Sequence, residues 1–164
     1  MPWTPEISVF DERSVKDNLI DYFEANQADA LLWANGGVTP LQSIRDFHKS
    51  PRLTSIFPAL TFLQTEHKAI FNDILIVTFS LVLEVALIHG NQDTLTDMGP
   101  IYAMALESML TNVPETTFNQ DSIIQVNSTI GGYETSFDVQ GKLKNKYIQI
   151  FQTRASWQIE ASAY

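Results

Sequence analysis

The stretch that decides the fold is NDILIVTFSLVLEVALIHGNQD, residues 72–93. Its run from Ile74 to Ile88 holds fifteen residues, of which only Thr78, Ser80 and Glu84 are not apolar. As an α-helix this run would be about 22 Å long, which is short of the roughly 30 Å of hydrocarbon in a membrane. Its length and the charge of Glu84 therefore argue against a membrane span.

Side-chain alternation predicts a β-strand over the same run. Many of its residues are β-branched or aromatic, and such side chains lose rotamer freedom in a helix. Alternate positions form one unbroken apolar face, made by Leu75, Val77, Phe79, Leu81, Leu83, Val85 and Leu87. The opposite face mixes polar residues with Ile and Val. A strand of about 50 Å should project from a small domain and meet a neighbouring subunit, and we place this contact around Glu84 to Ile88.

The whole chain has the size and composition of one globular domain. It has 164 residues, of which 45% are hydrophobic. We predict a single domain over residues 1–164, with residues 1–10 as an extended N-terminal arm. Cysteine is absent, which excludes disulfide bonds, thiolate metal ligands and a cysteine nucleophile from this sequence.

Charged residues are unevenly distributed along the chain, whose formal net charge is −9. From Ala69 to Gly141 there is no Lys or Arg, and the acids are Asp73, Glu84, Asp93, Asp97, Glu107, Glu115, Asp121, Glu134 and Asp138. Basic residues gather elsewhere, at Arg45, Lys49, Arg52, Lys142, Lys144, Lys146 and Arg154. Two interpretations are open: an acidic, soluble surface, or a polarity in which one surface repels phosphate and another docks an acidic copy or neighbour. Both disfavour a conventional nucleic-acid-binding protein, which needs clustered cations.

Local patterns predict the elements that precede the long strand. Asp11–Asn26 has apolar residues at helical spacing and a capping-box pattern from Ser14 to Asp17. Residues 28–35 fit either the last turns of that helix or a short strand, and we favour the strand. Gly36-Gly37 then marks a turn. A short second helix is predicted from Pro40 to about His48.

The residues around the long strand complete an α+β plan. Leu60 and Phe62 belong to a strand that turns back at a polar hairpin tip, residues 64–68. After the long strand, a helix is predicted from Thr94 to about Asn112, with Gly99-Pro100 bending it or marking its start. Three further strands are predicted over residues 122–130, 133–141 and 145–162. The predicted fold is an antiparallel sheet with a long central hairpin, covered on one face by two or three helices.

Catalytic and metal-binding patterns are sparse. His48, His67 and His89 are the histidines of the chain, and none has the spacing of a metal-binding motif. The sequence has no Gly-x-Ser-x-Gly nucleophile pattern. We therefore predict a protein that is not an enzyme and needs no cofactor or metal. The alternative is an enzyme or binder of a small molecule, with a cone-like α+β fold and an apolar pocket. The aromatic residues available to line such a pocket are Trp157, Phe151, Phe79 and Tyr102.

Taken in order, these elements resemble the tail terminator proteins of tailed bacteriophages and the related tail-completion and neck proteins. The likeness lies in the N-terminal helix, the FPAL strand entry at Phe57–Leu60, the hairpin, the long apolar strand, the helix after NQDTLTDMG at residues 91–99, and the C-terminal strand. It covers the chain from about Ser14 to the end. It is a likeness of element order, with no motif that aligns individual positions.

The resemblance implies a structural role in a virion. Members of this family are small α+β proteins that form a ring, commonly a hexamer, on the last ring of the tail tube. There they stop polymerisation and present a surface to the head connector. The implied partners are further copies of the chain, the tail tube protein and the head–tail connector protein, in the virion neck or tail and in the host cytoplasm during assembly. No membrane is implied, and a connector or tube protein with the same ring habit is an alternative.

Two groups of residues are candidates for these contacts. DNA would pass through the lumen of the ring without specific binding, because like charge keeps the duplex mobile. The acids that we expect to face the lumen are Asp73, Glu84, Asp93, Asp97 and Glu107. The residues that we expect to dock neighbouring proteins are Glu66, His67, Lys68, Lys142, Lys144 and Lys146.

Overall fold

The computed structural model describes residues 10–38, 41–52, 56–72, 74–118, 122–137 and 145–161. Its elements in chain order are α1 (Glu12–Ala34), β1 (Asp46–His48), β2 (Ala59–Asn72), β3 (Ile74–His89), α2 (Gln92–Thr111), the 3₁₀ turn η1 (Glu115–Phe118), β4 (Ser122–Phe137) and β5 (Tyr147–Ala161). The strands form one sheet in the order β1-β2-β3-β5-β4. Neighbouring strands are antiparallel, except for the parallel pair β1 and β2.

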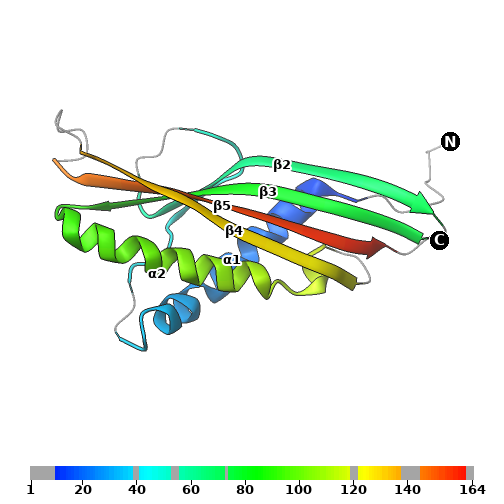
Figure 1. The fold of residues 1–164 in the computed structure, drawn as a ribbon, viewed down its shortest axis with the longest axis horizontal. Coiled ribbons are helices and arrows are strands. Elements are labelled where there is room, and N and C mark those ends of the chain that lie inside the picture. Colours follow the sequence, from blue (N-terminus) through cyan, green and yellow to red (C-terminus); the bar gives the residue numbers. More distant parts are fainter. Residues whose placement is uncertain are drawn as a thin grey trace.

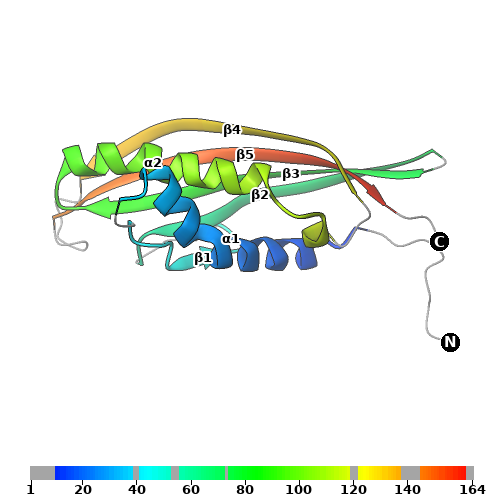
Figure 2. The ribbon, with the colours of Figure 1, turned by 90° about the horizontal axis from the view of Figure 1, so that it is seen from below.

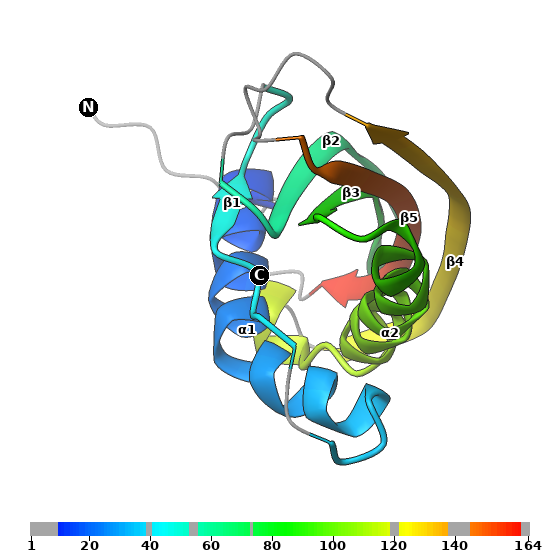
Figure 3. The same ribbon diagram turned by 90° about the vertical axis from the view of Figure 1, so that its left-hand side faces the viewer.

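Both described α-helices lie on one face of the sheet, so the predicted α+β fold class is confirmed (Figures 1 and 2). Viewed from one end, the sheet curves around α1 and α2 (Figure 3). The central strand is β3, which pairs with β2 along Ala59–Asn72 and with β5 along Tyr147–Ala161. The predicted long hairpin is therefore the β2–β3 pair at the centre of the sheet.

Alternation along β3 divides the sheet into a core face and an open face, as the sequence predicts. The apolar set from Leu75 to Leu87 is buried, and it packs in one cluster with residues of both helices. On β5 the residues Phe151, Ala155, Trp157 and Ile159 are buried on the same face, as predicted. The Phe79 and Trp157 rings stack with centroids 5.9 Å apart. The side chain of Ala161, predicted to join this face, lies outside the described residues.

The first helix is longer than predicted, and the predicted strand at residues 28–35 is wrong. Helix α1 continues to Ala34 because its buried stripe does not stop at Asn26: Gln27 and Leu31 extend it. The helix is capped by Asp11, whose Oδ1 accepts hydrogen bonds from the backbone N–H groups of Arg13 and Ser14. The N-cap is therefore Asp11, three residues before Ser14, the N-cap that the capping-box pattern predicts.

The predicted helix at residues 40–48 is also wrong, because tertiary partners satisfy this backbone instead. The buried Gln27 side chain accepts from Ile44 N at 2.7 Å and donates to Ile44 O at 3.2 Å, as a neighbouring strand would. Tyr102 Oη donates to the carbonyl of Gln42. Arg45 N donates to Pro58 O at 2.9 Å, which leads the chain into β1 beside β2. Pro40 itself lies outside the described residues.

The hairpin turns later than predicted. Residues 64–68 lie within β2, and the turn falls between Asn72 and Ile74. The polar residues Gln64, Glu66 and Lys68 alternate with their neighbours along the strand, so they are the exposed side of a strand and not a loop tip.

Two predicted strands are one. Residues 122–130 and 133–137 form the continuous strand β4, and Gly131-Gly132 lies at a shift of register between Ile130 and Tyr133. A Cβ at Gly131 would lie 3.0 Å from Gln152 O, so glycine allows the close approach of β4 to β5. Residues 138–141 of the predicted second strand lie outside the described residues.

Helix α2 begins at Gln92, two residues before the predicted start. Asn91 is its N-cap and accepts from Thr94 N at 3.1 Å through Oδ1. Pro100 lies inside the helix, so Gly99-Pro100 does not mark the start. The C-cap at Asn112 agrees with the prediction.

Replacing Gln27 tests its role as a strand-like partner of Ile44. Gln27→Met leaves a buried N–H and a buried C=O without their partner, and each such group costs about 1–3 kcal/mol. We expect the free energy of unfolding, measured by urea denaturation, to fall by about 2–4 kcal/mol. Glu24→Met, on the exposed side of the same helix, should change it by less than about 0.5 kcal/mol. Equal effects of the two substitutions would contradict this role.

The buried Tyr102 should make the folded protein less stable at high pH. Burial raises the pKa of Tyr102 to about 12, above the usual value of about 10. The protonated phenol therefore stabilises the fold below pH 10, and this contribution disappears as the pH rises from 10 towards 12. Tyr102→Phe should lower the free energy of unfolding by about 1 kcal/mol at pH 7, through loss of the bond to Gln42, and should flatten its decline above pH 10. Urea denaturation between pH 7 and 11.5 measures both, and identical declines in the two proteins would contradict the assignment.

Candidate assembly surface

The face of the sheet opposite the helices is the candidate functional surface, and we call it the open face. Its described residues on β2, β3 and β5 are half-buried or exposed: Gln64, Glu66, Lys68, Ile70, Ile76, Thr78, Ser80, Val82, Glu84, Ile88, Ile148, Ile150, Gln152, Arg154, Ser156, Gln158 and Glu160. One corner, at Ala59, Thr61 and Ala86, is buried. Four neighbouring strands of about 50 Å, at the usual spacing of about 4.8 Å, give the open face an area of about 900 Å². This is close to the roughly 800 Å² that each partner contributes to a standard protein interface.

On β2, β3 and β5 the open face is almost neutral, although the chain is acidic. Its described charged residues are Glu66, Lys68, Glu84, Arg154 and Glu160. Isoleucine and valine side chains lie between them, for example Ile76 and Val82. A second protein can therefore approach this face without the repulsion that a net charge of −9 exerts elsewhere.

A shallow groove of about 320 Å³, lined by polar and apolar side chains, crosses the middle of the open face. It is lined by residues of four strands, among them Glu66, Ser80, Asn127 and Arg154. These groups can donate to and accept from a polar partner surface. By contrast, a cavity between the helices and the sheet, next to Gln27 and Tyr102, holds about 10 Å³, which is about the space of one water molecule.

The aromatic residues proposed as the lining of an apolar pocket fill the core instead. Phe79, Phe151 and Trp157 are at most 1% exposed, and Tyr102 is 3% exposed. Phe118, at the end of η1, packs against Trp157 with ring centroids 5.2 Å apart. The sheet and helices thus close on one another around these rings.

The end of the sheet that projects beyond the helices is the turn of the β2–β3 hairpin (Figure 1). Ile70, three residues before the turn, is 69% exposed. The predicted contact around Glu84 to Ile88 lies at the other end of β3. There β5 pairs with the whole stretch, and β2 pairs with it as far as Ala86. A neighbour at Glu84 would contact its side chain on the open face.

The candidate lumen acids do not share one surface. Glu84 lies on the open face, opposite Thr61 on β2 and Gln152 on β5. Asp93, Asp97 and Glu107 lie on α2, on the other side of the sheet, with Asp93 and Asp97 exposed and Glu107 half-buried. Asp73 lies outside the described residues.

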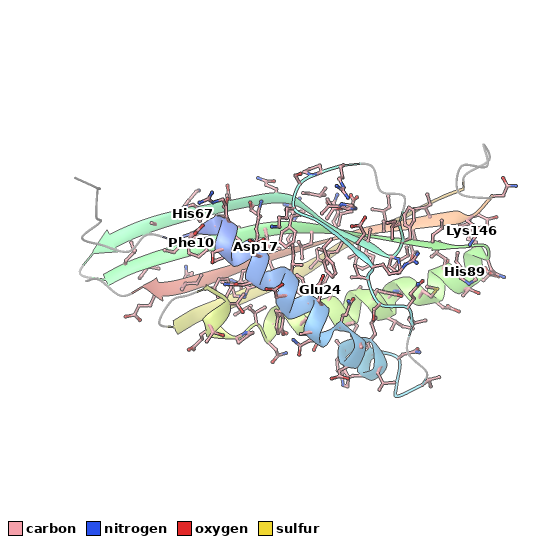
Figure 4. The ribbon with its side chains drawn as sticks, turned by 180° about the vertical axis from the view of Figure 1, so that it is seen from behind. Phe10, Asp17, Glu24, His67, His89 and Lys146 are labelled. Atoms are coloured by element: carbon pink, nitrogen blue, oxygen red, sulfur yellow. The ribbon has the colours of Figure 1, made fainter. Side chains whose placement is uncertain are left out.

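The candidate docking residues fall at the two ends of the molecule (Figure 4). Glu66 and Lys68 are exposed on the open face, whereas His67 points to the helix side. There His67 Nδ1 lies 3.3 Å from Glu12 Oε1, and the His67 ring lies 5.2 Å from the ring of Phe10, so His67 holds the start of α1 against β2. Lys146 is exposed at the opposite end, before β5. Lys142 and Lys144 lie outside the described residues.

Sequence reasoning missed an exposed apolar cluster at the end of α1. Leu32, Trp33 and Val38 are 37%, 60% and 63% exposed. A strand at residues 28–35 would have buried alternate members of this group. The signal that identifies it is the Gly36-Gly37 turn at positive φ, directly after a helix, which leaves the last helical turn at the surface.

Two further observations describe the chemistry open to the described residues. No three His, Asp or Glu side chains among them lie close enough together to hold a metal ion. None of the helices in the described part of the chain is long and apolar enough to cross a membrane.

Comparison with known proteins gives no family. No family model matches the sequence, and no curated protein matches it. Among solved structures, a chain from the virion of a native gene transfer agent particle is similar, with a TM-score of 0.46 and 8% sequence identity, over 85% of this chain and 92% of that chain. A likeness of this size assigns no function, so the resemblance to tail terminator proteins stays a prediction.

Proposed function

We propose that this protein is a structural component of a tailed-phage virion, in which identical copies form a ring. In this proposal the ring, a hexamer, caps the tail tube, ends its polymerisation and joins the tail to the head connector. The observation that carries the proposal is the open face of the long sheet, which neither α1 nor α2 covers. Its area is about that which one partner contributes to a standard protein interface. The order of elements adds the resemblance to tail terminator proteins.

The filled core supports a structural protein over an enzyme. Phe79 and Trp157 stack where the competing hypothesis needs an apolar pocket, and the cavity nearby has room for about one water molecule. The groove on the open face is shallow and mixes polar with apolar side chains, which suits contact with another protein surface better than enclosure of a small ligand.

The charge distribution supports a channel that does not hold DNA. Because the candidate lumen acids divide between the two sides of the sheet, we assign the channel to the α2 side, where Asp93, Asp97 and Glu107 lie on one helix. The segment from Ala69 to Gly141, which includes α2, has no Lys or Arg to bind phosphate. A duplex would pass such a wall without being retained.

A head–tail connector and a tube protein remain alternatives with the same ring. They differ from a terminator in what the ring binds. A terminator added to polymerising tail tube protein should bind one tube end and shorten the tubes. A connector should bind the head and leave tube length unchanged, and a tube protein should polymerise further. Tube lengths measured by electron microscopy distinguish the three.

The molecular mass in solution tests the ring. We expect native mass spectrometry and light scattering to give about six times the chain mass of 18.5 kDa, and electron microscopy to show a ring with a central hole. A monomer at micromolar concentration, or a dimer that does not associate further, would refute the ring and with it the proposed function.

If α2 lines the channel, the wild-type protein should bind DNA weakly, and reversing the acidic charges of α2 should strengthen the binding. Wild-type protein should not retain a duplex in gel shifts at about 150 mM salt, and D93K/D97K/E107K should retain it in a salt-dependent way. The matched control D21K/E24K/D29K makes the same change of charge on α1. Equal retention by both variants would show an effect of net charge alone, and tight binding by the wild type would contradict the channel.

A further inference from the structure

We propose that neighbouring copies in the ring join their sheets edge to edge, with β2 of one copy antiparallel to β4 of the next. This inference rests on the ring proposed above and assigns the contact between neighbouring copies to the edges of the sheet, which leaves the open face to the tail tube or the head connector. The occupant of each free edge is thus a second copy of this chain.

Among the described strands, the sheet has two long free edges. β1 pairs with β2 only at Ala59–Thr61, so within the described chain no strand pairs with β2 from Phe62 to Asn72 on that side. β4 is the other outer strand, and none of the described strands pairs with its outer side along Ser122–Phe137. Unpaired backbone N–H and C=O groups along an edge are a template for another strand.

Strand directions allow these two edges to meet in a ring. β2 is antiparallel to β3, β3 to β5, and β5 to β4, so β2 and β4 run in opposite directions. Rotation about an axis along the strands keeps each strand direction in the next copy. β2 and the next copy's β4 are therefore antiparallel, and the alternation of directions continues through the contact.

Charge favours this contact over a pairing of like edges. The described segments 41–52 and 56–72, which form the β2 edge, have four cations and two acids: Arg45, Lys49, Arg52, Lys68, Asp46 and Glu66. Asp17 of α1 pairs with Lys49, and Asp46 lies 3.8 Å from Arg52, so the positive charge that is not compensated locally rests mainly on Arg45 and Lys68. Near the opposite edge of the sheet, α2, η1 and β4 have no Lys or Arg. Arg154 belongs to β5, one strand in from that edge, and Lys146 directly precedes β5. Unlike edges attract and like edges repel, which selects a head-to-tail ring.

Cysteine cross-linking tests the pairing in a chain that has no cysteine of its own. Glu66 and Asn127 lie in one row across the sheet, through Ser80 and Ser156, and both are exposed on the open face. E66C/N127C therefore tests a contact in which β2 of one copy continues the rows of the next copy's sheet without a shift of register. Q64C/N127C and K68C/N127C test registers shifted by two residues in either direction. Residues directly opposite in antiparallel strands have Cα atoms about 4.5–5.5 Å apart, which a disulfide can span.

A head-to-tail contact makes a specific prediction for these variants. After oxidation, at least one double variant should give a ladder of covalent oligomers up to the ring size on a non-reducing denaturing gel, and each single variant should stay monomeric. E66C/M104C, with its second cysteine exposed on α2, is the control and should not link. A single variant that forms covalent dimers indicates a contact between like edges and overturns the proposal. If rings form but none of the three double variants forms cross-links, the pairing of β2 with β4 is wrong, whereas the proposed ring is not contradicted.

Charge reversal gives an independent measurement. R52E/K68E reverses two cations of the β2 edge and should raise the concentration at which rings dissociate by about tenfold at physiological salt. The control R13E/K16E makes the same change of charge on α1, outside this edge, and should have little effect. Equal dissociation of both variants would show that net charge, and not the edge, controls assembly, and would overturn the electrostatic part of the proposal.

Discussion

The two-residue alternation of β3 is the constraint on which the rest of the structure depends. Every second side chain from Leu75 to Leu87 is buried under the helices, and the side chains between them are on the open face, most of them half-exposed. A shift of one residue would place the apolar set in solvent, so the register of β3 with β2 and β5 is fixed by burial. Because β3 is central, that register also aligns the rows across the sheet in which Glu66 and Asn127 lie.

Helix α1 connects the parts that the sheet leaves separate. Asn18 Nδ2 donates to Thr117 O at 2.9 Å, Tyr22 Oη donates to Met109 O at 2.8 Å, and Gln27 pairs with Ile44. Each partner is a backbone group at a helix end or in a connection, where no regular ladder is available. α1 therefore fixes α2, η1 and the entry to β1 on one face of the sheet, and this concentration of supporting structure leaves the other face open.

Sequence patterns predicted what depends on neighbours in the chain and missed what depends on distant partners. The faces of β3 and β5 follow from alternation, and the C-cap at Asn112 from a local preference. The segment around Ile44 does not form its predicted helix, because its hydrogen bonds come from Gln27 and Tyr102, far away in sequence. For the candidate surface, the sequence predicts Glu66 and Lys68 in a loop, whereas they are exposed residues of a strand. The candidate lumen acids follow from the charge composition of one segment, and composition does not distinguish the two sides of a sheet, on which Glu84 and Asp97 lie.

Two long edges that no other described strand pairs with create a physical problem for the chain, and its charges help to solve it. Exposed edges promote uncontrolled association, and the usual protections are short strands, covering loops and charges. Here β1 covers only three residues of β2, and the net charge of −9 opposes most encounters between copies. When the β2 edge of one copy approaches the β4 edge of the next, the cations of the β2 edge approach a strand that has no Lys or Arg. A closed ring pairs every such edge, so assembly ends when the ring closes and no edge is left for further growth.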